Sequence, residues 1–184
     1  MAKIYDNMVV RGLSGALGRQ LVVRHDKAGR TIVGNWPKFK ATREFSETQI
    51  AHENAFREAA AYAQSAKDQP IYTSKAIGTA LSAYNVALAD WFHASEIKAL
   101  ELGSWKGQPG QLIRIKALDD VLVKQVSVTI TSAAGAVLEK GDAVQTDSMW
   151  WEYTTTANGS GNLTVTAAAQ DMPGNVTEMS KSSA

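Results

Sequence analysis

The run from Leu112 to Val128 constrains the fold more than any other stretch, because it alternates apolar and polar residues with a period of two. That period is typical of a β-strand with one buried face. The alternation breaks at Asp119-Asp120, so we predict two strands with an acidic corner between them. On the first strand the residues expected to face the core are Ile113, Ile115 and Ala117.

The rest of the C-terminal half continues as short apolar runs separated by turn residues. We predict further strands over 121–130, 137–139, 149–156, 162–168 and 176–179. Turns are predicted at 132–135, 140–142, 158–161 and 171–175. Six or seven strands within about 75 residues indicate an all-β sandwich of immunoglobulin-like type. The chain has no cysteine, so packing alone must stabilise it, and we expect Trp150 or Trp151 to be its buried aromatic residue.

The N-terminal part opens with a predicted β-hairpin. Its strands are 20–24 and 30–36, and the turn contains Asp26 and Gly29. A two-stranded hairpin is marginal alone, so it must pack against something. Four basic residues give it a charged surface and are our candidate interaction residues: Arg19, Arg24, Lys27 and Arg30. The glycine-rich segment 12–18 is not a phosphate-binding loop on this pattern, because a strand follows it where such a loop needs a helix.

Two helices are predicted next. Ser46 and Gln49 form a capping box, and a helix with small residues on one side runs to about Lys67. A second helix is predicted over 74–92, with an apolar stripe formed by Ile77, Ala80, Leu81, Tyr84, Leu88 and Trp91. We interpret the stripe as a helix–helix core within an αα-hairpin; a ligand pocket is the alternative.

The change of period near residues 95–108 indicates a division of the chain. We predict a β-hairpin and helical-hairpin region over 1–100 and a β-sandwich over 101–184, which is an α+β architecture. Charge divides the chain at a different place: residues 1–45 hold nine Lys and Arg against three Asp and Glu, the rest of the chain is mildly acidic, and the whole chain has a net charge of +1. The low net charge gives no general case for nucleic-acid or membrane binding.

The chemistry-bearing residues form no catalytic pattern. Three histidines, His25, His52 and His93, lie far apart with no metal-ligand spacing, and we expect neither an enzyme nor a cofactor. One weak calcium hypothesis concerns the strand-end carboxylates Asp119, Asp120 and Asp171. The simpler interpretation is that these aspartates cap turns by accepting bonds from their own backbone.

Two resemblances add to this reading. Residues 108–179, with I-R-I-K-A-L-D-D, V-S-V-T-I, W-W-E-Y-T-T and D-M-P-G-N, resemble bacterial immunoglobulin-like repeats, which implies the sandwich fold and no particular ligand. Residues 10–65, with G-L-S-G-A-L-G-R-Q-L-V-V-R and S-E-T-Q, resemble small uncharacterised proteins of Bacteroidota, some associated with phages or phage-like elements. That resemblance implies a virion-like or tail-like structural context and brings no catalytic residues.

We therefore expect a structural component or passenger of a phage-like particle, such as a virion, a tail or a contractile injection machine, that assembles through its basic N-terminal region. Its partners would be proteins, through a homo-oligomer or lattice contact. The alternative is an adhesion module whose sandwich binds carbohydrate or protein through exposed aromatic residues among Trp105, Trp150, Trp151 and Tyr153, with Trp105 as the residue to test. We expect at least two of these tryptophans to lie in the core instead. The N-terminus shows no signal-peptide pattern and no run is long enough to span a bilayer, so we expect cytoplasmic synthesis, or association with a particle after release.

Overall fold

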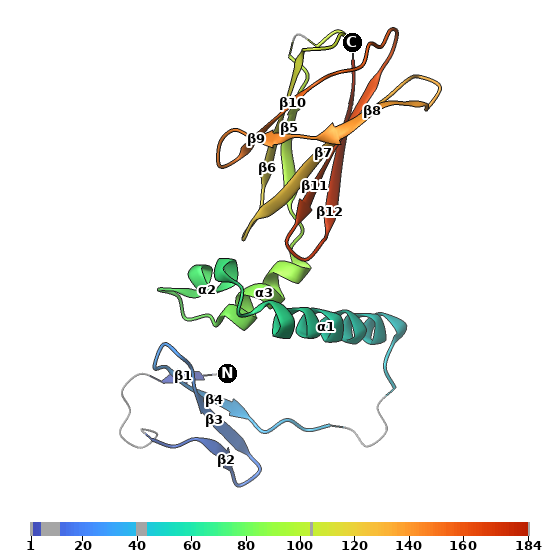
Figure 1. Ribbon diagram of the computed structural model, residues 1–184. Coiled ribbons are helices and arrows are strands. Elements are labelled where there is room, and N and C mark those ends of the chain that lie inside the picture. Colours follow the sequence, from blue (N-terminus) through green and yellow to red (C-terminus); the bar gives the residue numbers. More distant parts are fainter. Residues whose placement is uncertain (1, 5–11, 40–43, 104, 184) are drawn as a thin grey trace.

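The computed structural model describes residues 2–4, 12–39, 44–103 and 105–183. Three parts follow one another along the chain and in space (Figure 1): an N-terminal sheet, a layer of helices and a β-sandwich. The predicted α+β class is confirmed, and strands predominate over helices.

The N-terminal part is a four-stranded antiparallel sheet with the order β1-β4-β3-β2. Its strands are β1 (Ala2–Ile4), β2 (Gly15–Leu17), β3 (Leu21–His25) and β4 (Thr31–Asn35). The predicted hairpin is the β3–β4 pair, and Gly29 adopts the positive φ of 74° that its turn requires. Strands β1 and β2 were not predicted, because β1 is three residues long and β2 begins at a glycine that masks the strand pattern.

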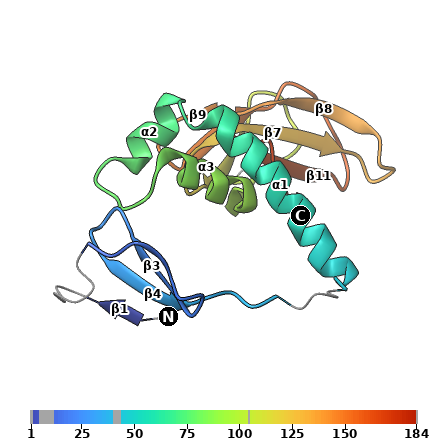
Figure 2. The same cartoon turned by 90° about the horizontal axis from the view of Figure 1, so that it is seen from below.

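The first predicted helix is confirmed as α1 (Glu47–Ala66), with both hydrogen bonds of the Ser46–Gln49 capping box present. The small residues Ala59, Ala63 and Ala66 are buried, and α1 packs beside α3 (Figure 2). Small side chains on this face allow the two helix backbones to approach closely, as expected from the sequence.

The second predicted helix is wrong as a single element. The structure has α2 (Pro70–Ala76) and α3 (Ala83–Phe92), separated by a segment in which Gly78 has a φ of 75°. Ile77 and Leu81 lie in this segment, 78% and 50% exposed, so they do not contribute to the predicted stripe. The chain leaves the helix at Ile77, whose backbone is extended, and Gly78 then takes the left-handed region, although the apolar spacing continues through both.

The C-terminal part contains two antiparallel four-stranded sheets, with the orders β5-β6-β10-β9 and β12-β11-β7-β8. The first sheet comprises β5 (Glu96–Glu101), β6 (Leu112–Leu118), β9 (Val144–Gln145) and β10 (Trp150–Thr154). The second comprises β7 (Val123–Thr131), β8 (Val137–Asp142), β11 (Thr164–Asp171) and β12 (Val176–Ser182). The Asp119-Asp120 corner lies where the chain leaves one sheet and enters the other.

The core of the sandwich follows the predicted alternation. Ile113, Ile115 and Ala117 are at most 1% exposed, and they pack in one cluster with alternate residues of β7 and β11. Of the two tryptophans proposed for the core, Trp151 is buried and Trp150 is half-buried, as expected on adjacent strand positions that face opposite sides.

Strand order supports the immunoglobulin-like prediction. Lettered along the chain, the first sheet reads A-B-E-D and the second reads G-F-C-C′, which are the neighbour relations of that topology. Two boundaries differ from the prediction. Because β5 pairs with β6, the sandwich begins at Glu96 and not at residue 101. Residues 140–142 continue β8 and do not form a turn.

No helix within the described part of the chain has the length and apolarity needed to cross a bilayer.

Candidate interaction surfaces and the buried acidic junction

A cleft opens beside the turn between β2 and β3 of the N-terminal sheet. It has a volume of about 730 Å³ and is lined by Arg19, Gln20, Leu21, Asn35, Trp36 and Lys38. The backbone fixes both sides, because the Gln20 N–H donates to the Leu17 carbonyl at 3.0 Å and the Trp36 N–H donates to the Gln20 carbonyl at 2.7 Å. An indole and a leucine between two cations can bind a surface that combines apolar and acidic side chains. We call this site the basic cleft.

Arg19 occupies an unusual backbone position in the basic cleft. It has a φ of 55°, and no other non-glycine residue in the described part of the chain has a positive φ. Gly18 before it also has a φ of 55°, so the two residues form the tight kind of hairpin turn in which both central positions are left-handed. An arginine here costs about 1 kcal/mol relative to a residue that tolerates this region. Backbone strain of this kind is concentrated at binding and active sites.

The other three predicted basic residues do not line the basic cleft. Lys27 and Arg30 lie at the β3–β4 turn, at the far end of the hairpin, and Arg24 lies on β3. Arg30 donates two hydrogen bonds to the Asp26 carboxylate: its backbone N–H bonds to Oδ1 at 2.9 Å, and its side-chain Nε bonds to Oδ2. The backbone bond from Arg30 lowers the pKa of the Asp26 carboxyl, and the side-chain bond and charge of Arg30 lower it further. Arg30 therefore stabilises the turn.

Of the six residues that line the basic cleft, sequence reasoning identified only Arg19. Lys38 and the exposed Trp36 complete its lining, and the available signal was a tryptophan beside a proline within a basic segment.

A second surface lies on the first half of α1. A shallow groove of about 500 Å³ is lined by Phe45, Thr48, Gln49, His52, Glu53 and Phe56. Its walls are mainly apolar, and Phe56 is 48% exposed. The ring of His52 lies 6.2 Å from that of Phe92, which places the C-terminal end of α3 beside the groove. We call this surface the α1 groove.

The aromatic residues proposed for carbohydrate binding are mostly in the core. Trp105 is 6% exposed, so the prediction that it is an exposed stacking residue is wrong. The reason is tertiary: the Trp105 ring joins the sandwich cluster although its neighbours in sequence are polar and glycine-rich. Trp151 and Tyr153 are buried as well. Trp150 differs, because two cations lie over its ring. The Arg114 guanidinium is 4.6 Å and the Lys116 ammonium 5.7 Å from the ring centroid.

The three predicted calcium ligands do not converge on a common point. Asp119 Oδ2 accepts bonds from the Val121 and Leu122 N–H groups at 2.8 and 2.7 Å, and Asp120 forms an exposed pair with His93. Among the described residues, no three His, Asp or Glu side chains gather as a metal-ligand set. The calcium hypothesis needed such a set, and the turn-capping alternative describes Asp119 correctly.

Asp171 and Asn175 connect the sandwich to the helices. Asp171 Oδ1 accepts from the backbone N–H groups of Gly174 and Asn175, and its Oδ2 accepts from the Asn175 amide at 2.8 Å. The same amide donates to the Trp91 carbonyl of α3 at 3.2 Å. The D-M-P-G-N motif is thus a rigid turn whose last residue contacts the helix layer, which its likeness to sandwich repeats did not indicate.

A buried chain of hydroxyl groups ends on a carboxylate inside the helix layer. Tyr72 OH donates to Asp90 Oδ2 at 2.6 Å, and Tyr62 OH lies 2.6 Å from Tyr72 OH. Asp90 is 1% exposed, and Tyr72 is fully buried. Val121 of the sandwich packs in the same cluster as Tyr72, so this network lies at the junction between helices and sandwich.

Burial makes Asp90 a weaker acid than usual. Loss of solvation raises its pKa to about 6, the bond from Tyr72 opposes the rise, and the charges of Asp119, Asp171 and Asp120 add to it. Desolvation and the bond to Asp90 also raise the pKa of Tyr72 well above its ordinary value. One oxygen of Asp90 and one of Asp119 are buried without a hydrogen-bond partner within the described part of the protein. The junction therefore holds a carboxylate whose charge is poorly compensated.

A second buried carboxylate, Glu139 on β8, is fully bonded. Its Oε1 accepts from Tyr153 OH at 2.6 Å, from the Thr156 N–H at 2.6 Å and from the Thr156 hydroxyl at 2.7 Å. Its Oε2 accepts from the Ala157 N–H at 3.0 Å. Desolvation raises the pKa of Glu139, but these bonds outweigh it and the pKa falls below the ordinary value. Glu139 fixes β8 to the segment that follows β10.

Comparisons with known proteins give no family. Neither a family model nor a curated protein matches the chain. The crystal structure of CopC from Methylosinus trichosporium OB3b is 16% identical, covering 48% of this chain and 89% of that one, with a TM-score of 0.38. A tetra-tandem repeat in the extending region of a large adhesion protein is 24% identical, with a TM-score of 0.35, and covers 48% of this chain and 22% of that chain.

A conjugative transposon lipoprotein from Bacteroides eggerthii DSM 20697 is 14% identical, with a TM-score of 0.28, and covers 48% of this chain and 92% of that chain. At these TM-scores the matches assign no function, and the functional argument depends on the surfaces described above.

Proposed function

We propose that this chain is a non-enzymatic assembly protein whose N-terminal sheet is completed by a protein partner. The proposal rests on how little of that sheet is buried. Among the described residues 12–39, Val23 alone is buried. A sheet is stable when one face is covered by another layer, and a sheet of short strands without cover is marginal. Val23 also belongs to neither of the two buried clusters in the rest of the protein.

A second observation supports a protein partner: several apolar side chains on this sheet and just after it are exposed. They are Leu13, Leu17, Leu21, Trp36 and Phe39, with exposed fractions from 38% to 74%. Apolar surface gathered on a small element beside basic residues is typical of a protein-binding surface. By contrast, the sandwich has a complete core.

The assembly that we propose is a phage-like particle, such as a virion, a tail or a contractile injection machine. What supports it is the resemblance of residues 10–65 together with the arrangement of the chain. A sandwich of immunoglobulin-like type, held on a helix layer, would be displayed outward while the N-terminal sheet is fixed in the particle.

Density-gradient fractionation of lysates from the source cells tests the proposal. The wild-type chain should co-sediment with large particles. Trp36→Asp places a charge in the basic cleft at an exposed position and should move the chain to the light fractions. Val137→Asp is the matched control, since Val137 is also exposed, at 62%, but lies on the sandwich. Wild-type protein confined to the light fractions as a monomer would overturn the proposal.

An adhesion module is the second candidate, and Trp150 is the observation that favours it. Its half-buried ring lies on the outer side of the first sandwich sheet, with Arg114 and Lys116 against it. An aromatic ring with flanking cations can stack on a sugar that carries an acidic group. Glycan-array binding that disappears in Trp150→Ala and persists in Trp36→Asp would favour this candidate over the first.

A further inference from the structure

We propose that the basic cleft of one copy of this chain binds the α1 groove of a second copy. This inference rests on the proposed function, because it names the partner that covers the N-terminal sheet. The contact would be head-to-tail: each copy offers its cleft to one neighbour and its groove to another. Contacts of this kind build rings or open filaments, which are the forms found in tubular and lattice assemblies.

Charge complementarity is the first reason. Residues 12–39 carry five Lys and Arg and one Asp. Residues 44–56, which form the groove segment, carry Glu44, Glu47 and Glu53; Glu53 pairs with Arg57 of the next turn at 2.8 Å, so Glu44 and Glu47 supply the net negative charge. Opposite charges on two surfaces of one chain favour contact between copies and disfavour contact between identical surfaces. A symmetric pairing of groove with groove would bring the three carboxylates together.

Apolar complementarity is the second reason. The basic cleft offers Leu21 and Trp36, which are 39% and 38% exposed. The α1 groove offers Phe56, and Ile50 on the same helix half is 48% exposed. A contact between the two surfaces would remove these side chains from water and place Arg19 and Lys38 near the glutamates. The positive φ of Arg19 fits this contact, because strained backbone occurs at binding sites where the side chain has a role.

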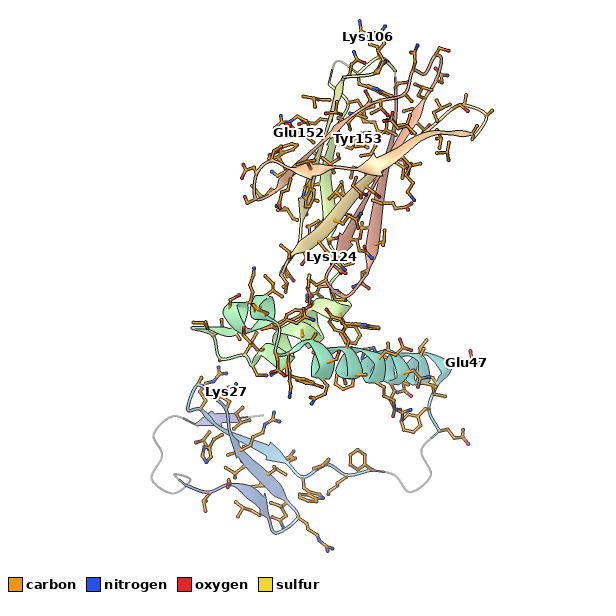
Figure 3. All side chains as sticks on the ribbon, viewed as in Figure 1. Lys27, Glu47, Lys106, Lys124, Glu152 and Tyr153 are labelled. Atoms are coloured by element: carbon orange, nitrogen blue, oxygen red, sulfur yellow. The ribbon has the colours of Figure 1, made fainter. Side chains whose placement is uncertain are left out.

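The arrangement within one chain favours a second copy over its own helix. No residue lines both the basic cleft and the α1 groove. In Figure 3 the start of α1, at Glu47, lies away from the N-terminal sheet, which is labelled at Lys27. Val23 joins no cluster with helix residues.

The test uses two double variants of the full chain. Arg19→Glu with Lys38→Glu reverses the cleft, and Glu44→Lys with Glu47→Lys reverses the acidic edge of the groove while leaving the capping box of α1 and the Glu53–Arg57 pair in place. Lys124→Glu with Lys140→Glu is the control for the cleft variant, because these exposed lysines give the same charge change on the sandwich. An unchanged Tm shows that each variant is folded.

Sedimentation velocity from about 1 to about 200 μM is the measurement. Wild-type protein and the control should form oligomers whose mass rises with concentration and falls with salt. Each interface variant should associate at least about tenfold more weakly. An equimolar mixture of the cleft variant and the groove variant should associate again, since the intact groove of the first meets the intact cleft of the second, and the reversed cleft and reversed groove also carry opposite charges.

The mixture identifies the contact. A monomeric wild-type chain, or a mixture that does not associate, would overturn the inference. Oligomers that survive in both variants would overturn it too. Failure here is distinguishable from failure of the proposed function: a chain that is monomeric alone but co-sediments with particles through Trp36 has a different protein in its cleft, and the assembly role stands.

Discussion

Replacement of Asp90 by asparagine should stabilise the protein at neutral pH and remove a pH dependence that the wild type shows. Asp90 is buried at the junction of helices and sandwich, accepts one bond from Tyr72 and has one oxygen without a partner. Asparagine has nearly the same shape, keeps an acceptor for Tyr72 and carries no charge. The change therefore removes the desolvation of a buried charge without opening a cavity.

The magnitude follows from the pKa of Asp90, which burial raises from 3.8 to about 6. A shift of about two units corresponds to about 3 kcal/mol. The folded protein binds the proton more tightly than the unfolded chain, so the contribution of Asp90 to stability is full below pH 3.8 and is lost as the pH rises through 6. The free energy of unfolding of Asp90→Asn, relative to wild type, should therefore rise by about 2 kcal/mol between pH 4 and pH 8.

Urea unfolding followed by tryptophan fluorescence at several pH values measures this difference. Asp68→Asn is the control, because it makes the same chemical change at an exposed position and should give a constant offset. Tyr72→Phe should move the wild-type midpoint to higher pH, since the bond from Tyr72 lowers the pKa of Asp90. A difference between Asp90→Asn and wild type that stays flat from pH 4 to pH 8 would refute the reasoning.

Three further substitutions, one with a matched control, test the sandwich and its contact with the helices. Glu139→Gln turns an amide toward groups that donate to the carboxylate, and should lower the free energy of unfolding by about 2–4 kcal/mol in urea titrations. Gly107→Ala places a Cβ 2.4 Å from a backbone oxygen at a φ of 77° and should destabilise by about 3 kcal/mol, whereas Gly110→Ala, with a φ of 79° and open space, should show only the backbone strain of about 1 kcal/mol. Asn175→Ala removes the hydrogen bond to the Trp91 carbonyl, so the helices should unfold at a lower temperature than the sandwich. Far-ultraviolet circular dichroism follows the helices, and coincident unfolding of helices and sandwich would contradict the role of Asn175 in connecting them.

The parts of the fold that were predictable are those with a local physical cause. The period of two around Ile113 and Ile115 reports one buried face, and the structure buries both residues completely. Ser46 and Gln49 satisfy each other's backbone groups within four residues, so the start of α1 could be placed from sequence. The β3–β4 turn needs a glycine at a positive φ, and Gly29 is there.

The parts that were not predictable depend on distant neighbours. Trp105 is buried by residues of the sandwich that no local pattern connects to it. Asp90 meets Tyr72 from another helix, and neither position is distinguished in the sequence. The basic cleft unites the β2–β3 turn with Trp36 and Lys38, which follow β4, and the hairpin register that brings them together became visible only with the structure.

Hydrogen exchange of the N-terminal sheet tests the central claim most directly. The claim is that this sheet lacks a core of its own and gains one from a protein partner. In the isolated chain, the amides of β3 and β4 should exchange orders of magnitude faster than those of β6 and β7, and they should become protected in the assembled form. Protection of β3 and β4 in the isolated monomer that equals the protection of the sandwich would contradict the account.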